Sequence, residues 1–285
     1  MTLTLRRGDF TLDLAPETGG AISALTWRGQ PVLRQGPGQG DVLDMASFPL
    51  VPFANRIALG RVNWSGGLFD LPLNLDGEPH ALHGDGWQSV WSVESHSEDA
   101  AALTLKGGTS WPWPYEARQT FTLEADGLYQ TLSLTNLSEQ PAPFGLGFHP
   151  YFPASEEARL VARLSGVWLT DETNLPARHL QGWPLVDWRW GAGFPPGRVI
   201  DHCHTGWDGA ALFNPGPGRP SLRLSAGPDI TRLHIYAPPG EGYVCLEPVT
   251  HRPDAINTQD PEAEGLVILA PGATHEIWMR LSLLT

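Results

Sequence analysis

Four short segments place polar side chains that could move protons inside otherwise apolar, strand-like sequence. They are Phe53-Ala54-Asn55-Arg56-Ile57, Ala81-Leu82-His83-Gly84, Gly145-Leu146-Gly147-Phe148-His149-Pro150-Tyr151-Phe152 and Cys245-Leu246-Glu247-Pro248-Val249-Thr250. Taken singly, His149 fits a hydrogen-bonded core histidine and Glu247 fits a salt-bridged edge residue. A carboxylate between Leu246 and Pro248 is nevertheless costly to bury, because its charge then needs partners.

Together these segments and Asp201 supply a carboxylate, two histidines, an arginine and an aspartate. A histidine can give a proton and a glutamate can take one, each with its pKa adjusted by burial and neighbours. Such a set suits general acid–base chemistry near neutral pH and needs no cofactor. We therefore expect a proton-transfer site that contains Glu247, His149 and His83.

The run Asp201-His202-Cys203-His204 contains metal-ligand residue types. On a strand, Asp201 and Cys203 would face one way and the two histidines the other, so at most two could converge on one ion. No second cluster with zinc-like spacing completes a set of four, and we expect no metal. A G-x-S-x-G elbow, a P-loop and an H-E-x-x-H motif are also missing, and the glycines at 36, 38 and 40 indicate a plain loop.

The charge balance and the cysteine count narrow the classes of partner and the cellular compartment that we expect. The 285 residues carry 18 basic and 31 acidic side chains, a net charge of −13, and Lys106 is the only lysine. A strongly acidic surface repels phosphate backbones and anionic lipid, so we expect neither nucleic acid nor membrane as a partner. Two cysteines are too few for a disulfide scaffold, and no apolar run follows the N-terminus, so we expect a cytoplasmic protein.

Alternating apolar and polar residues predict many short strands. Phe10, Leu12 and Leu14 lie two apart, and residues 119–135 form the clearest pattern, a hairpin around Asp126-Gly127. Strands are also expected at 90–94, 102–106, 266–269 and 277–283. No window shows a helical period with caps, and 32 glycines and 27 prolines favour turns. We expect one antiparallel β-sandwich over residues 1–285, with most of the 12 tryptophans in the core.

The functional segments resemble the aldose 1-epimerase (galactose mutarotase) family. The matching pieces stand in the family's order, and they are Asn55-Arg56-Ile57 with Gly60-Arg61, Leu82-His83-Gly84 with Trp91, Gly147-Phe148-His149-Pro150-Tyr151-Phe152, Asp201-His202, Leu246-Glu247-Pro248 and Pro253-Asp254-Ala255-Ile256-Asn257. They span residues 55–257. The resemblance implies a large antiparallel β-sandwich that holds a monosaccharide on its concave face and interconverts the α and β anomers of a free aldose.

The resemblance also implies a role for each site residue. Glu247 would act as general base on the anomeric hydroxyl and His149 as general acid on the ring oxygen, with His83 sharing the acid's work. Arg56, Asp201 and, beside them, Asn55 would bind sugar hydroxyls. At the fourth motif Cys203-His204 replaces the more usual aromatic residue, so either Asp201 or His202 could be the hydroxyl-binding group.

Other functions stay open at this stage. A mutarotase of a phosphorylated or sulfonated hexose would need a cationic pocket, which Arg56 and Arg61 could supply. A carbohydrate-binding homologue without activity would not need both His149 and Glu247. A glycoside hydrolase would need two carboxylates beside the scissile bond. Glu247 could be one of them, and Asp201 is the weaker candidate for the other. The preferred aldose and the choice between monomer and homodimer are likewise open.

Overall fold

The long strands show the alternation that the sequence predicts. In the computed structural model, which describes residues 2–284, every second side chain of β12 (Tyr115–Leu123) is buried. β13 (Gly127–Asn136) returns antiparallel to it, so that Leu123 lies opposite Leu128. The predicted hairpin around Asp126-Gly127 is confirmed, because alternation of this kind buries one face of a strand and leaves the other polar.

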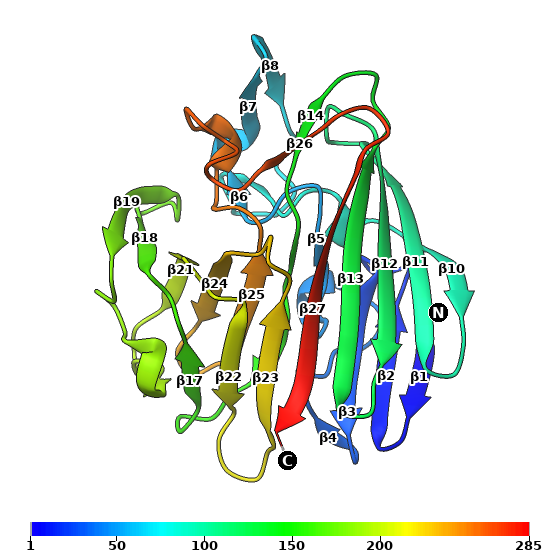
Figure 1. Cartoon of the computed structure of the whole chain (residues 1–285), viewed down its shortest axis with the longest axis vertical. Helices are drawn as coiled ribbons and strands as arrows, with labels where there is room; N and C mark the ends of the chain where they lie inside the picture. Colours follow the sequence, from blue (N-terminus) through cyan, green and yellow to red (C-terminus); the bar gives the residue numbers. More distant parts are fainter. Residues whose placement is uncertain (1, 285) are drawn as a thin grey trace.

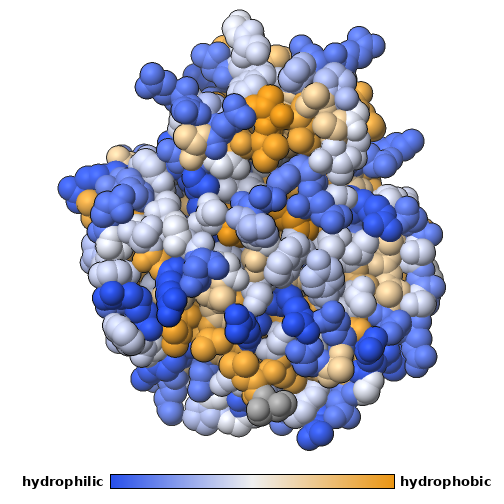
Figure 2. Space-filling model, viewed as in Figure 1, coloured by the Kyte–Doolittle hydropathy of each residue, from blue (hydrophilic) through white to orange (hydrophobic). Residues whose placement is uncertain are grey.

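β12 and β13 belong to a nine-stranded sheet that forms the front layer in Figure 1. From edge to edge its strands are β10 (Ser92–His96), β11 (Ala100–Gly107), β12, β13, β27 (Thr274–Leu284), β23 (Ser221–Ala226), β22 (Ala210–Asn214), β17 (Arg159–Ala162) and β20 (Ala192–Gly193). Its outer surface is mainly hydrophilic with scattered apolar patches (Figure 2). The other face packs into the core.

Two further sheets form the back layer (Figure 1). A four-stranded sheet contains β1 (Leu3–Arg7), β2 (Phe10–Ala15), β3 (Ala21–Trp27) and β4 (Gln30–Pro31). An eight-stranded sheet runs β19 (Pro176–Gln181), β18 (Gly166–Thr170), β21 (Ile200–Thr205), β24 (Arg232–Ala237), β25 (Tyr243–Val249), β15 (Gly147–Phe148) and β5 (Pro49–Leu50), with β16 (Tyr151–Pro153) also paired to β25. One apolar cluster contains residues of all three sheets, including Leu12, Leu224 and Leu246.

Short pairs complete the fold. They are β14 (Ala142–Phe144) with β26 (Val267–Leu269), β6 (Arg56–Ile57) with β9 (Ala81–Leu82), and β7 (Arg61–Trp64) with β8 (Gly67–Asp70). The described residues form five 3₁₀ turns, namely η1 (Val42–Asp44), η2 (Ala58–Gly60), η3 (Gly86–Gln88), η4 (Trp188–Trp190) and η5 (Ala255–Asn257). Residues 2–284 contain no α-helix, and therefore no helix in that range is long and apolar enough to cross a membrane.

The all-β antiparallel architecture is therefore confirmed. The segments 266–269 and 277–283 do form strands, but β26 pairs with β14 and β27 pairs with β13 and β23. The two strands follow one another in the chain without forming a hairpin. Six of the twelve tryptophans are buried, and Trp27 and Trp64 pack against the core from partly buried positions, as the core interpretation predicts. Trp190 is the most exposed of those in the described range.

Candidate functional site

A cavity of about 470 Å³ opens on one face of the eight-stranded sheet. This volume lies within the range of small-molecule sites. It is lined by Leu43, Asn55, Arg56, Leu75, Leu82, His83, His149, Tyr151, Asn174, Val199, Asp201, His234, Tyr236, Tyr243 and Glu247. All six site residues that the sequence predicts line this cavity. His202 does not line it, so Asp201 is the group of that motif that faces the cavity.

Three neighbouring strands supply the wall of the cavity. Asp201 on β21 lies opposite Tyr236 on β24, and His234 on β24 lies opposite Glu247 on β25. Because side chains alternate along a strand, these residues share one face, while Leu233 and Ile235 point into the core on the other. The sheet thus places a histidine and two acidic side chains beside one another.

Backbone geometry at the cavity rim positions His83. Asn55 and His83 both have positive φ, at 60° and 58°. The backbone N–H of Asn55 donates to Nδ1 of His83 over 3.0 Å, and the backbone N–H of His83 donates to the carbonyl of Asn55 over 2.8 Å. Because Nδ1 accepts, the proton of the neutral ring lies on Nε2. His83 therefore offers an N–H donor to a ligand.

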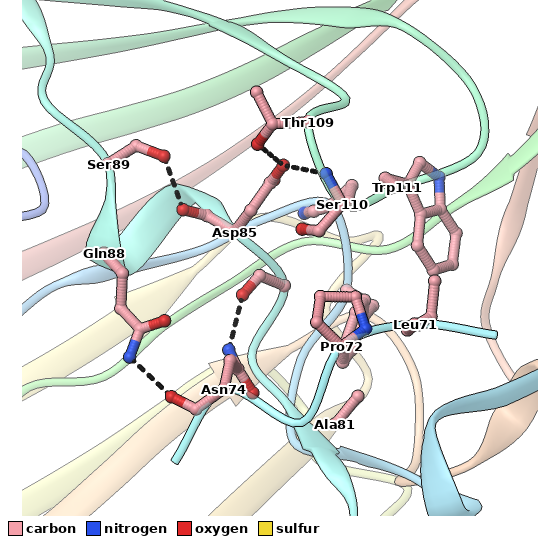
Figure 3. A pocket seen from close by; sticks show the side chains of 13 residues that line it. Leu71, Pro72, Asn74, Ala81, Asp85, Gln88, Ser89, Thr109, Ser110 and Trp111 are labelled. Atoms are coloured by element: carbon pink, nitrogen blue, oxygen red, sulfur yellow. Dashed lines mark hydrogen bonds between the residues drawn. The ribbon is translucent and has the colours of Figure 1, made fainter.

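A second cavity, of about 250 Å³, lies next to the loop that carries His83, and residues that line it hold this loop by hydrogen bonds (Figure 3). Its Asn74 side chain donates to the carbonyl of Leu82 over 2.7 Å and to that of Gly84 over 3.0 Å. The carboxylate of Asp85, in the same loop, accepts from the hydroxyl of Thr109 over 3.1 Å and from the hydroxyl of Tyr115. These contacts fix the backbone on both sides of His83.

His149 sits on an aromatic platform beside Glu247. Its ring stacks on Tyr151 with centroids 4.7 Å apart and packs against Phe48 at 4.5 Å. Nε2 lies 3.4 Å from Oε1 of Glu247. Nδ1 of His149 and Oε2 of Glu247 are buried and have no hydrogen-bond partner among the described residues. Buried polar atoms of this kind are rare unless a ligand or water satisfies them.

Arg56 links the rim of the cavity to its wall. Its Nε donates to Glu78 over 3.0 Å, and Nη1 donates to Oδ1 of Asn55 over 3.3 Å. The same Nη1 lies 3.6 Å from Oδ2 of Asp201. The guanidinium is therefore shared by two carboxylates and fixes Asp201 from one side.

Burial and charge set the protonation states. Burial raises the pKa of Glu247 to about 7, although the positive charge of His234 opposes the rise. Burial lowers the pKa of His149 to about 3 and that of His83 well below its usual value, so both rings are neutral near pH 7. The pKa of Asp201 falls to about 2 because the hydrogen bond and charge of His234 outweigh burial. The pair His149 and Glu247 thus combines a neutral N–H donor with a base that titrates near neutrality.

The strand carrying Asp201-His202-Cys203-His204 divides these four side chains between two faces, as predicted. Three other groups, His149, Cys245 and Glu247, have ligand atoms within 4.8 Å of one another. Burial, however, raises the pKa of the Cys245 thiol well above its usual value. A metal needs the thiolate, so binding at this trio would have to overcome the burial penalty on that deprotonation.

Sequence reasoning missed several cavity residues. His234 is the most consequential, because it bonds Asp201 over 2.7 Å. The sequence also did not predict Tyr236 and Tyr243 of the cavity lining, or Glu78, which lies outside that lining and accepts from Arg56. In the strand Arg232–Ala237 apolar and polar residues alternate, and His234 is on the polar face. This pattern was the available signal, but it does not say which strands lie beside it.

Comparison with solved structures defines the fold class first. The chain superposes on a galactose mutarotase-like protein from Clostridium acetobutylicum with a TM-score of 0.87, at 18% identity, over 99% of this chain and 94% of that one. A galactose 1-epimerase from Lactobacillus acidophilus NCFM gives a TM-score of 0.77 at 18% identity, over 99% and 93% of the two chains. The fold is thus that of the galactose mutarotase-like β-sandwiches.

More similar relatives define the family. The sequence model of the aldose 1-epimerase family matches residues 1–282. The uncharacterized Escherichia coli (strain K12) protein YphB is 36% identical over 98% of both chains. An Escherichia coli K12 crystal structure, whose description as an aldose 1-epimerase is provisional, gives a TM-score of 0.93 at 33% identity over 100% of this chain and 99% of that one. The chain belongs to the aldose 1-epimerase family.

Proposed function

We propose that the protein is an isomerase that interconverts the α and β anomers of a free aldose hexose such as glucose or galactose. The observation that carries this proposal is the contact between His149 and Glu247, with Nε2 and Oε1 3.4 Å apart at the wall of the cavity. The ring oxygen and the anomeric hydroxyl are bonded to one carbon. The two groups that serve them must therefore be close neighbours, as these are.

In this mechanism the ionised Glu247 takes the proton of the anomeric hydroxyl. The N–H of His149 gives its proton to the ring oxygen as the bond from C1 to that oxygen breaks, and the imidazolate that is left takes the proton back on closure. Rotation about C1–C2 of the open aldehyde presents the other carbonyl face, and closure reverses both transfers. A neutral imidazole is a known electrophile for a substrate oxygen, and His83 adds a second N–H donor.

The remaining polar groups suit the hydroxyls of a neutral sugar. Asp201 presents a carboxylate, and Asn55 and Arg56 present amide and guanidinium groups, at the edge of the cavity. Fixed donors and acceptors of this kind hold the ring in one orientation and supply positioning to the reaction.

The charges favour a neutral sugar over a phosphorylated or sulfonated one. Arg56 is already shared by Glu78 and Asp201. Arg61 lies outside the cavity lining, in the exposed β7–β8 hairpin, 4.0 Å from Asp70. The arginine pair that could have bound an anionic group is therefore divided. A glycoside hydrolase is also disfavoured, because Asp201 is held by both His234 and Arg56.

Polarimetry tests the proposal. Freshly dissolved α-D-glucose and α-D-galactose should approach their equilibrium rotation faster with the protein near pH 7. Glu247→Gln and His149→Asn should each lose about 10²–10⁴-fold of that acceleration. Glu276→Gln on the exposed side of β27 is the matched control and should keep it. No acceleration with any neutral hexose, together with acceleration of a sugar phosphate or sulfonate, would reject the free-sugar substrate.

A further inference from the structure

His234 occupies the centre of the cavity wall, although the expected acid–base chemistry does not use it. It lies on β24, opposite Cys203 of β21 on one side and opposite Glu247 of β25 on the other. The residue is only 3% exposed, and its Nε2 lies 2.7 Å from Oδ1 of Asp201. Directly opposed residues on antiparallel strands have Cβ atoms about 4.5–5.5 Å apart, so Glu247 is within close electrostatic reach.

The groups that face His234 come from five parts of the fold. Those near it are Asp201 and Cys203 on β21, Glu247 on β25, Arg56 on β6, and the rings of His83 and His149. Two of them are carboxylates, and both histidine rings are neutral near pH 7. Burial alone would lower the pKa of His234, but Glu247 and Asp201 raise it to about 10. His234 is the protonated histidine of the site.

We propose that His234 is a positioning residue, a buried imidazolium that fixes Asp201 by a hydrogen bond and keeps Glu247 in the carboxylate form that accepts a proton. Only the kinetic consequence of this inference rests on the proposed function; the charge and contacts of His234 do not. A buried ion pair with a hydrogen bond is strongly coupled to its neighbours, and removal of one partner leaves the others uncompensated.

The hydrogen-bond pattern explains why His234 positions other groups instead of serving as the acid itself. Nε2 is bonded to Oδ1 of Asp201, while Oδ2 of the same carboxylate lies 3.6 Å from Nη1 of Arg56. Asp201 is thereby held between two cations and can present a fixed acceptor to a sugar hydroxyl. The positive charge of the imidazolium stabilises the ionised form of Glu247, on the neighbouring strand β25, without a transfer of its proton to that carboxylate.

The pH dependence of kcat/KM distinguishes this role from a structural one. In His234→Gln the charge that favours ionised Glu247 is lost, so the acid limb should move up by about one pH unit or more. That corresponds to a factor of about ten in the ionised fraction at pH 6, with a much smaller deficit at pH 9. His234→Lys restores a positive charge and should return the limb toward the wild-type position.

His204→Gln is the matched control. His204 is as buried as His234, on the neighbouring strand β21, but it faces away from the cavity. Its variant should keep the wild-type limb. An acid limb that stays in place in His234→Gln, or that moves equally in His204→Gln, would overturn the proposal.

A measurement without substrate separates this inference from the proposed function. Long-range ¹H–¹⁵N spectra of the histidine rings report whether both nitrogens carry protons, and the resonances lost in His234→Gln identify His234. We expect the ring to remain doubly protonated at pH 8 and to lose its proton at a lower pH in Asp201→Asn. A neutral ring at pH 8 would overturn the inference even in a protein that epimerises sugars. A charged ring in a protein inactive on every sugar would leave the inference standing and reject the function.

Discussion

Nε2 of His149 lies 3.4 Å from Oε1 of Glu247; His149 directly follows β15, and Glu247 lies on β25 of the same sheet. The sheet can join them because Gly147 pairs directly with Val249, which brings the chain after β15 alongside Glu247. A Cβ at Gly147 would lie 2.8 Å from a methyl group of Val249 and 3.0 Å from the carbonyl of Pro248. The close pairing of the two strands therefore depends on the absence of a side chain at position 147.

The protonation of Glu247 should control activity across neutral pH. Burial raises its pKa to about 7, and only the carboxylate can accept the anomeric proton. We expect kcat/KM for mutarotation to rise with pH through about 7 and to level off above it. Polarimetry between pH 5.5 and 8.5, corrected for the buffer-catalysed rate, measures this limb. A flat profile in that range would show that Glu247 is not the titrating base.

The same pKa makes a prediction for stability. The folded protein holds a proton on Glu247 between pH 4.5 and about 7, where the unfolded chain has released it, so this group lowers stability as the pH rises through that window. Glu247→Gln removes the effect, which is on the order of 3 kcal/mol. We therefore expect the Tm of this variant, relative to that of the wild type, to be higher at pH 8.5 than at pH 4.5.

Thermal melts followed by circular dichroism at the two pH values provide the measurement. Glu276→Gln, at an exposed position of β27, should change Tm by a similar small amount at both. Equal Tm differences for Glu247→Gln at pH 4.5 and pH 8.5 would contradict the linkage.

The sequence predicts the strands and six cavity residues because both depend on local patterns. Alternation over 119–135 specifies a hairpin, and the short motifs around Glu247 and His149 mark unusual polar residues in apolar surroundings. The alternation in 201–204 also separates Asp201 from His202, but it does not say which side faces a ligand. That choice depends on β21, β24 and β25 lying side by side in one sheet. Between β21 and β24 the chain first forms β22 and β23, which belong to the nine-stranded sheet.

His234 could not be predicted for the same reason. Its significance comes from Glu247 thirteen residues away on one side and Asp201 thirty-three residues away on the other. Neither neighbour is visible from the strand Arg232–Ala237 itself. Glu78 is likewise an ordinary acidic residue in a loop until the fold brings it 3.0 Å from Arg56.

Arg56 should be sensitive even to lysine. Its guanidinium donates to Glu78 and Asn55 and lies beside Asp201 through separate nitrogens, whereas a lysine has one ammonium group. We expect Arg56→Lys to raise KM by about tenfold or more, with a smaller effect on kcat, because ligand positioning is weakened. Arg118→Lys, which alters an exposed pair with Glu94, is the control and should leave both constants unchanged. A fall in kcat at constant KM would instead place Arg56 in the chemical step.

Asn74 should influence turnover although it does not line the larger cavity. Its side chain bonds the carbonyls of Leu82 and Gly84 and accepts from the backbone N–H of Leu82 over 2.8 Å, so it holds His83 from both sides. Without these bonds, the left-handed backbone at His83 is less well supported, and the imidazole can leave its place at the cavity. We expect Asn74→Ala to lower kcat about tenfold or more while the circular dichroism spectrum is kept. Asn63→Ala in the exposed β7–β8 hairpin is the control, and a wild-type kcat in Asn74→Ala would show that His83 needs no support from behind.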